Sequence, residues 1–389
     1  MDTLVFNFLR YLLLFQIVVI GTDLAKRKVV SNTKYWTSVL PIILVYSFME
    51  GCRWERGVDY VSYYALAEGR FESDDLFLDI TAAVLRVIGL PPSFFFIILS
   101  GILIISLLRM VKDFRVAFIP CLLLMYVFSM QQSENLVSQW CATSLMLVCF
   151  CLFYEKRWFI FVIVAFLAFF SHKSILFVVP FLVVFHLIFN TLGKGRDSNI
   201  TPAIFLLLYA ISTTLQSYFQ LSLQDLEVAL SINNEGYLSD EYLRMALQEG
   251  ESQKEMMAAT YYLRSYIRNI VIIVLGFYAI KAEVFQNHQN KLYVAYGIAC
   301  SSIIYIASLP DFQIEVIGRL NIYLAIFSYF IEGLVIYVFA LSKTWKTLVI
   351  ARWHTLMKLF VYLLLILDIM LIFKPIFPGE IGLKFIWSD

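Results

Sequence analysis

The stretch VFNFLRYLLLFQIVVI (Val5–Ile20), followed closely by the basic cluster AKRK (Ala25–Lys28), indicates the class of this protein. It lacks a small-residue cleavage site and runs directly into the cluster, so we expect a retained membrane helix. The rest of the chain is similarly rich in apolar residues. Its 389 residues are 61% hydrophobic and only 15% charged, with a mean hydropathy of +0.78. A soluble core could not hide so much apolar surface, so we predict an all-α polytopic membrane protein, with residues 1–389 as one integral membrane domain.

The apolar runs predict about twelve transmembrane helices when about 20 residues are allowed for each span. The expected spans are roughly 4–22, 36–50, 93–109, 116–131, 136–154, 158–171, 174–190, 201–218, 266–281, 292–309, 320–342 and 357–373.

The basic residues predict the orientation of these spans. Alternation from the cluster after residue 22 puts on one side the loops 23–35, 109–115, 155–157, 191–199, 281–291 and 343–358, which hold seventeen Lys and Arg residues. The opposite loops are about twice as long but hold twelve, counting Arg268 in the first turn of the span 266–281. By the positive-inside rule the first set is cytoplasmic, and both termini face the outside. The net charge of +1 gives no electrostatic case for binding nucleic acid.

Two long outward loops, 51–92 and 219–265, contain apolar residues at helical spacing, as in DITAAVLRVIG (Asp79–Gly89). We expect short amphipathic helices in both loops, lying on the outer membrane surface. The loop 51–92 is also acidic, and its Glu72 and Asp74 have the spacing of a weak metal motif.

Three outward turns are short for the spans that they join. The hairpin from Trp158 to Asn190 has 33 residues, with Ser171-His172-Lys173-Ser174 in its middle, whereas two full spans need about 40. Polar backbone below the membrane surface is tolerated inside protein or beside a water-filled cavity. We therefore predict an outward-open cavity lined by residues 50–60, 131–139 and 171–174.

His172 is the strongest candidate for a catalytic base. It lies at the polar turn of the hairpin, and Lys173 beside it would lower the pKa of the imidazole and keep it neutral. A neutral imidazole can take a proton from a sugar hydroxyl. The competing interpretation is a histidine that only caps the hairpin. No histidine pair has ligand spacing, so we expect no metal site.

Five arginines on the outward side are candidates for binding an anion. Arg264 and Arg268 are four residues apart and share a helix face, and Arg53 and Arg56 are three apart; Arg319 begins a late span. Arginine is scarce on this side, and its planar fork matches phosphate oxygens with two hydrogen bonds. The alternatives are snorkelling to lipid headgroups or pairing with nearby acids.

Carboxylates and aromatic residues beside these arginines are candidates for handling a sugar. Glu55 and Asp59 are rival catalytic bases or sugar ligands, as are Asp311 and Glu315. Tyrosines of the outer loops could stack on sugar rings, although an interfacial aromatic belt explains them equally well; the leading ones are Tyr60 and Tyr64.

Four segments together resemble the EpsG/Wzy family of bacterial polysaccharide polymerases. They are the loop Arg53–Tyr60 with Tyr63 and Tyr64, the block from Asn135 to Arg157, the hairpin Ser171–Ser174, and the span start Gly318–Tyr323. Their order covers most of the chain, and each motif by itself is moderately specific. One departure is Ser138-Gln139, where the family usually has Arg-Gln. If that arginine binds pyrophosphate in relatives, another arginine must replace it here.

The resemblance implies a fold similar to the C-type membrane glycosyltransferases and an enzyme that needs neither metal nor cofactor. The implied substrates are polyprenyl-pyrophosphate-linked glycans, joined at the periplasmic face of the bacterial inner membrane. Membrane lipids and a chain-length regulator protein are the implied partners. His172 would be the base, the five arginines would bind pyrophosphate, and the glycan would contact Tyr60, Tyr64, Gln139, Asp311, Glu315 and Tyr323.

Three other functions compete with the polymerase. An O-antigen ligase would use the same donor with a different acceptor, and residues 219–265 could serve as its large outer loop. A transporter or lipid-glycan flippase would carry out no chemistry, and it would spread polar residues through the membrane depth. An acyltransferase would also use a membrane histidine. The polar residues here gather at one face, which favours an enzyme.

Overall fold

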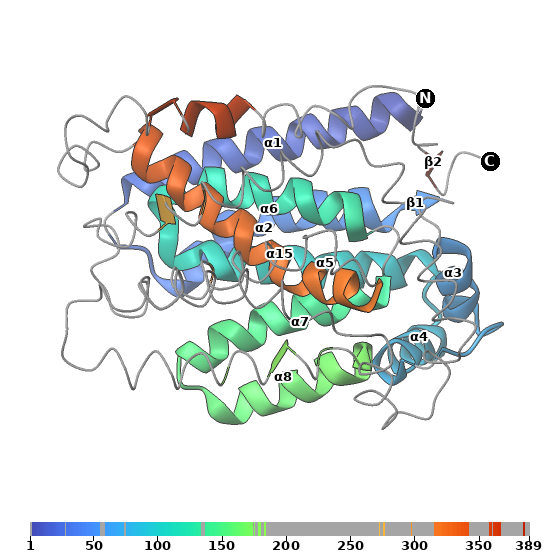
Figure 1. The fold of residues 1–389 in the computed structure, drawn as a ribbon. Coiled ribbons are helices and arrows are strands. Elements are labelled where there is room, and N and C mark those ends of the chain that lie inside the picture. The colour runs from blue at the N-terminus through green and yellow to red at the C-terminus, as the bar shows by residue number, and fades with distance from the viewer. Residues whose placement is uncertain are drawn as a thin grey trace, which may run out of the picture. The chain divides into compact units, whose positions relative to one another are not determined.

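The computed structural model describes residues 2–27, 29–54, 59–73, 75–133 and 137–173, and beyond them shorter stretches, of which 315–341 and 361–366 are the longest. The described elements are α1 (Asp2–Lys26), α2 (Asn32–Gly51), β1 (Arg53–Trp54), α3 (Tyr60–Glu68), α4 (Leu76–Ile88), α5 (Ser93–Val111), the 3₁₀ turn η1 (Lys112–Ala117), α6 (Phe118–Ser133), α7 (Val137–Tyr154), α8 (Trp158–Ser171), α15 (Glu315–Ile336), the π turn η5 (Tyr337–Leu341) and β2 (Lys384–Phe385) (Figure 1). The two-residue strands pair antiparallel, with Arg53 opposite Phe385.

The chain divides into two compact units. The first contains residues 1–183 and 332–389, and the second contains residues 184–331. The helices α1 to α8 and the strand pair belong to the first unit, and α15 begins in the second. The prediction of one domain, 1–389, stays a prediction.

The all-α membrane class is confirmed in the described residues. Four segments are long and apolar enough to cross a membrane: Leu4–Lys26, Ser93–Met130, Val137–Tyr154 and Tyr323–Ala340. The second of these contains α5 and α6, joined at η1, where Phe114 leaves helical geometry. Trp158–Ser171 is a shorter apolar helix, consistent with the short hairpin predicted there.

Each of the first six expected spans coincides with a helix, α1, α2, α5, α6, α7 or α8, and the expected span 320–342 coincides with α15 and η5. The spans expected between residues 184 and 309 lie outside the described residues, apart from isolated positions. The total of twelve therefore stays a prediction.

Three charged loops that the sequence predicts on one side do meet at one end of the first unit. The Arg109 guanidinium at the end of α5 donates to both carboxylate oxygens of Glu155, at 2.7 and 2.6 Å. Lys112 donates to the Asn32 side chain at 2.8 Å, and Arg115 donates to the Arg27 carbonyl at 3.2 Å. These bonds join the loops after α1, α5 and α7, so the six long helices cross in alternating directions.

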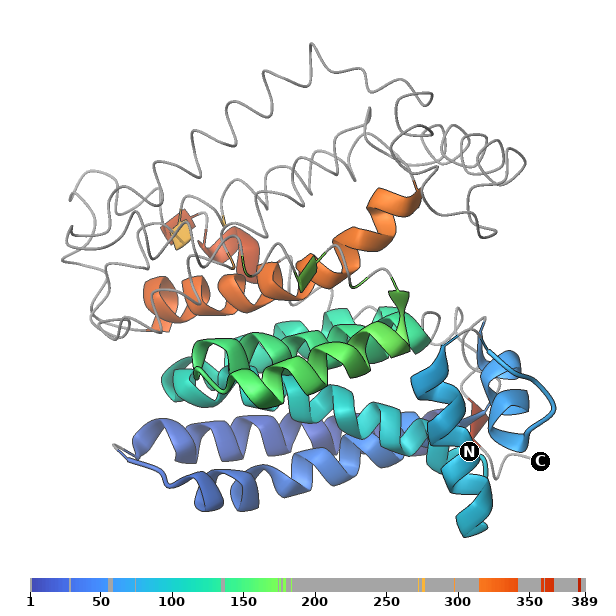
Figure 2. The ribbon, with the colours of Figure 1, turned by 90° about the horizontal axis from the view of Figure 1, so that it is seen from below.

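The opposite end carries the outward loop 51–92, which folds into α3 and α4 (Figures 1 and 2). The amphipathic helix expected in this loop is confirmed as α4, whose buried residues Leu78, Ala82 and Leu85 share one face. Gly69 and Gly89 end the two helices in the left-handed conformation, at φ of 82° and 78°. Glycine adopts these angles without a side-chain clash. The loop 219–265 lies outside the described residues.

Helix α2 packs against α5 with no space for a side chain at its last residue. A Cβ atom at Gly51 would lie 2.5 Å from the Ile97 Cα atom and 2.7 Å from the Ile97 nitrogen, both backbone atoms of α5. At the other end of the same pair, the Tyr35 hydroxyl donates to the Leu108 carbonyl at 2.6 Å. Small residues allow such close approach of membrane helices, and here only glycine fits at the last residue of α2.

We predict that Gly51→Ala separates the outer ends of α2 and α5 and destabilises the fold by about 1–3 kcal/mol, because backbone must move to admit the methyl group. Gly101→Ala is the matched control on α5, since its added Cβ would meet only the Ser47 hydroxyl, at 3.3 Å. Thermal unfolding of the two variants in detergent measures the difference. Equal unfolding midpoints would show that the contact does not limit the packing.

The two ends of the first unit should react from opposite sides of the membrane. We predict that Ser31→Cys and Lys156→Cys react with an impermeant thiol reagent only after the membrane is breached, whereas Arg70→Cys reacts in intact cells. All three positions are exposed, and the native cysteines of the described segments are buried. Labelling of Lys156→Cys in intact cells would reverse the predicted orientation.

Candidate functional site

Arg53 lies where α2 stops, at the end of the first unit opposite the loops joined by Arg109, Lys112 and Arg115. The helix ends at Gly51, and the Cys52 amide still donates to the Phe48 carbonyl at 3.0 Å. The chain then becomes extended, and β1 pairs with β2. Only 4% of the Arg53 surface is exposed, and its guanidinium carbon lies 5.3 Å from the centre of the Phe96 ring of α5. This is a cation–π contact, which is stronger where water is excluded.

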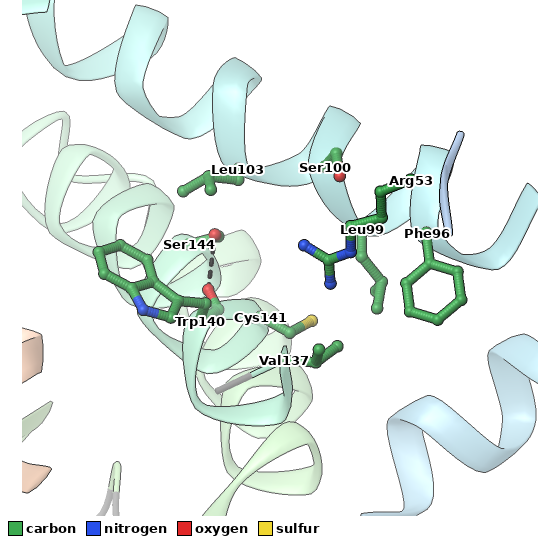
Figure 3. A pocket seen from close by; sticks show the side chains of 9 residues that line it. All are labelled: Arg53, Phe96, Leu99, Ser100, Leu103, Val137, Trp140, Cys141 and Ser144. Atoms are coloured by element: carbon green, nitrogen blue, oxygen red, sulfur yellow. Dashed lines mark hydrogen bonds between the residues drawn. The ribbon is translucent and has the colours of Figure 1, made fainter. Parts of the chain in front are cut away.

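A small cavity lies between α5 and α7, with the Arg53 side chain at its edge. Its volume of about 20 Å³ is enough for one water molecule. Figure 3 shows the guanidinium between the side chains of the two helices. The Ser144 hydroxyl in the wall donates to the Trp140 carbonyl at 2.7 Å. The complete lining is Arg53, Phe96, Leu99, Ser100, Leu103, Val137, Trp140, Cys141 and Ser144.

Aromatic rings lead from this cavity to the outward surface. Tyr60 at the start of α3 stacks on Phe96, with ring centres 4.9 Å apart and planes 16° apart. Tyr64, one turn later, stacks on Tyr60 at 5.6 Å. Tyr60 is buried and Tyr64 is half-buried. The structure therefore brings Arg53, Tyr60 and Tyr64 together through Phe96, a contact that the sequence did not predict.

Tyr63 connects α3 to the first turn of α7. Burial raises the pKa of its phenol to about 12, while a hydrogen bond with Ser138 acts in the opposite direction. Tyr63 is therefore neutral at physiological pH. Asp59, which precedes α3 and is half-buried, lies within electrostatic range of the same phenol. Ser138, where relatives were expected to have arginine, thus contacts an outer-loop tyrosine.

His172 follows the last residue of α8 at the same end. Its amide donates to the Ala168 carbonyl at 3.1 Å, its backbone is extended, and its side chain is half-buried. The neighbouring residue, Ser171, is buried and lies 3.7 Å from the sulfur of Cys141, which lines the cavity. Helix α8 ends at Ser171, as the predicted turn requires, and most of the return span 174–190 lies outside the described residues. His172 is one residue away from a contact with the cavity wall.

Two buried charged residues were missed by the sequence analysis. Glu50 is 1% exposed and one helical turn before Arg53, and both groups lie within electrostatic range of the Tyr46 hydroxyl. Arg10 is fully buried in α1. Both interrupt apolar runs of the sequence, and an ionisable residue within a membrane span is rare enough to be a signal of function.

The other candidates fall into three groups. Gln139 is buried in α7 but is not part of the cavity lining. Tyr323 is fully buried in α15 and belongs to the second unit, as do Glu315 and Arg319. The candidates outside the described residues are Glu55, Arg56, Arg264, Arg268 and Asp311. The predicted grouping of the five arginines therefore stays a prediction.

Metal-ligating side chains do not cluster in the described segments, where no group of three His, Cys, Asp or Glu residues could hold an ion. The polar groups of the site are instead a guanidinium, hydroxyls and an indole. A guanidinium donates hydrogen bonds and cannot lose its proton in a protein, so the charge at this site is a permanent cation.

The fold and the site together define a polytopic α-helical membrane protein with a buried arginine at one membrane face. The sequence profile of the EpsG family matches residues 36–378, which is nearly the whole chain. The chain belongs to the EpsG family, as its motifs indicated. No curated protein and no solved structure matches it.

The buried carboxylate of Glu50 should stabilise the end of α2. We predict that Glu50→Gln, which keeps the shape but removes the charge, lowers the free energy of unfolding by about 1–3 kcal/mol, because it changes a buried electrostatic cluster. Glu68→Gln is the control, since Glu68 pairs with Arg70 on the exposed surface, where a pair contributes about 0–1 kcal/mol. Equal unfolding temperatures of the two variants would show that the Glu50 carboxylate does not stabilise the buried group that it forms with Tyr46 and Arg53.

Proposed function

We propose that this chain is a polysaccharide polymerase that joins polyprenyl-pyrophosphate-linked repeat units at the outer leaflet of the bacterial inner membrane. The observation that carries the proposal is the buried guanidinium of Arg53, held over Phe96 beside a cavity. It lies at the end of the helices opposite the loops rich in lysine and arginine. Membership of the EpsG family supports polysaccharide polymerisation as the reaction.

The chemistry needs two functions from the protein. The hydroxyl oxygen of the acceptor sugar attacks the anomeric carbon of the donor, and the bond from that carbon to the pyrophosphate oxygen breaks. The hydroxyl proton goes to a base, and the polyprenyl pyrophosphate leaves with the electron pair. A base and a cationic hydrogen-bond donor at the leaving oxygens are therefore sufficient, provided that the two substrates are correctly placed.

We assign His172 as the base and Arg53 as a pyrophosphate ligand. The half-buried position of His172 beside Ser171 leaves it accessible to substrate at the outward face. Arg56, Arg264, Arg268 and Arg319 remain proposed additional ligands of the pyrophosphate. Asp59 and Glu55 are the alternative bases. The half-buried ring of Tyr64, supported by the buried Tyr60 on which it stacks, is the aromatic surface that we assign to a sugar. Tyr60, Gln139, Asp311, Glu315 and Tyr323 remain proposed glycan contacts.

Arg53→Lys tests the ligand assignment because lysine keeps the charge but lacks the planar fork. We predict that both Arg53→Lys and Arg53→Ala reduce polymerisation by about 100- to 1,000-fold, the usual effect of removing one donor to a developing anion. The measurement is the ladder of chain lengths in cells with equal membrane levels of each variant. Arg70→Lys, at an exposed arginine of the same loop, should polymerise normally. A normal ladder with Arg53→Lys would contradict pyrophosphate binding by the fork.

His172→Ala and His172→Gln test the base. We predict that both are inserted normally and lose about 100- to 10,000-fold in the rate of sugar joining, because glutamine can hydrogen-bond but cannot accept the proton. Cells should then accumulate single lipid-linked repeats. Arg70→Ala, at an exposed cation of the loop 51–92, is the control and should give a full ladder.

The outcomes of the His172 experiment separate the rival functions. Activity kept by Gln and lost by Ala would make His172 a positioning residue and move the search for the base to Asp59. Loss of all surface glycan, single repeats included, would favour a ligase or a flippase over a polymerase.

A further inference from the structure

Helix α4 exposes a continuous apolar stripe on the side away from its buried face. Its exposed residues recur at helical spacing, and at about 100° per residue they cover roughly a third of the circumference. The stripe contains no charged or polar side chain, and Val87 within it is 88% exposed. The stripe consists of Leu76, Ile80, Val84, Val87 and Ile88.

The charged side chains of α4 lie outside the stripe and bond within the loop 51–92, although Arg86 is itself exposed. Arg86 donates to the Leu66 carbonyl of α3 at 2.6 Å. The Asp79 carboxylate accepts from both the amide and the hydroxyl of Ser73, each at 3.1 Å. The remaining side, with Leu78, Ala82 and Leu85, is buried. A helix on a water-exposed surface would show the reverse arrangement, with its charged residues outward.

The position of α4 along the membrane normal follows from its connection to α5. Four residues, 89–92, separate the end of α4 from Ser93, the first residue of α5, and four residues reach at most about 14 Å. Because α5 is part of a segment long and apolar enough to span the membrane, α4 lies near the outer boundary of the hydrocarbon.

Apolar side chains are also exposed on α8, the helix against which α4 packs. Helix α4 packs against α8, and Phe166 and Phe170 in the outer half of α8 are exposed and stack on each other. An apolar helix exposes such residues where acyl chains surround it. The surface beside α4 is therefore already apolar at the same end of the molecule.

We propose that α4 is an interfacial helix whose stripe is inserted among the lipid headgroups and upper acyl chains of the outer leaflet. The partner is the bilayer itself, and the charge-free stripe indicates apolar insertion and not attraction to anionic headgroups. The Arg86 and Asp79 bonds then hold α3, with Tyr60 and Tyr64, at the level of the membrane surface. The proposal does not depend on the reaction that the protein catalyses.

Fluorescence quenching by lipid-attached nitroxides tests this proposal. Ile80→Cys and Val87→Cys are labelled with the environment-sensitive dye NBD, and Glu72→Cys, at an exposed polar position of the same loop, is the matched control. Each protein is reconstituted at one copy per nanodisc. We expect blue-shifted emission at positions 80 and 87, with stronger quenching by nitroxides high on the acyl chain than by nitroxides at its end, and water-like emission at position 72. The parent chain, treated with the dye in the same way, gives the background from the native cysteines.

Two results would overturn the proposal. Water-like, unquenched emission at positions 80 and 87 would place the stripe in solvent. Blue-shifted emission that lipid nitroxides do not quench would show that protein covers the stripe. If that shift appears only in nanodiscs with two copies, a second copy of the chain is the occupant; if it persists with one copy, another segment of the same chain is.

Discussion

The close approach of α2 to α5 at Gly51 and Ile97 is the contact on which the outward end depends. The α5 backbone leaves no space for a Cβ atom at Gly51, the last residue of α2, and two residues later Arg53 lies over the Phe96 ring. Tyr60 of α3 stacks on the same ring. The tightest contact between α2 and α5 is therefore close to a buried cation, which is costly unless its surroundings are fixed. At this end of the molecule, the packing of α2 on α5 and the placement of Arg53 therefore involve neighbouring residues of the same two segments.

The sequence predicted the features that depend on local composition: the positions of helices and the charge of the loops between them. Apolar runs located the helices, the lysines and arginines grouped the charged loops correctly, and the pattern DITAAVLRVIG (Asp79–Gly89) predicted α4. Arg53 was singled out because arginine is scarce on the outward side. The contacts that build the site were not predicted, because they join residues far apart in the chain: Arg53 with Phe96, Tyr63 with Ser138, and Cys141 with Ser171. Gln139 precedes Trp140, which lines the cavity, but Gln139 itself does not. Which face of α7 is turned toward the cavity depends on tertiary packing, and the sequence does not show it.

The two ends of the first unit have different roles. At one end, ion pairs and hydrogen bonds such as Arg109 with Glu155 join the loops. At the other, the charges of Glu50 and Arg53 are buried and the outer loop folds over them as α3 and α4. This polarity suits a reaction that takes lipid-linked substrates from one leaflet only.

The most direct test of the account is a reaction with purified components. The protein is reconstituted in liposomes with lipid-linked repeat units extracted from cells in which its gene is deleted, and both glycan length and free polyprenyl pyrophosphate are measured. The account predicts glycans longer than one repeat, with one polyprenyl pyrophosphate released for each linkage formed, and neither product with the Arg53→Ala protein. Binding or movement of the repeat units across the bilayer, without release of pyrophosphate, would contradict it.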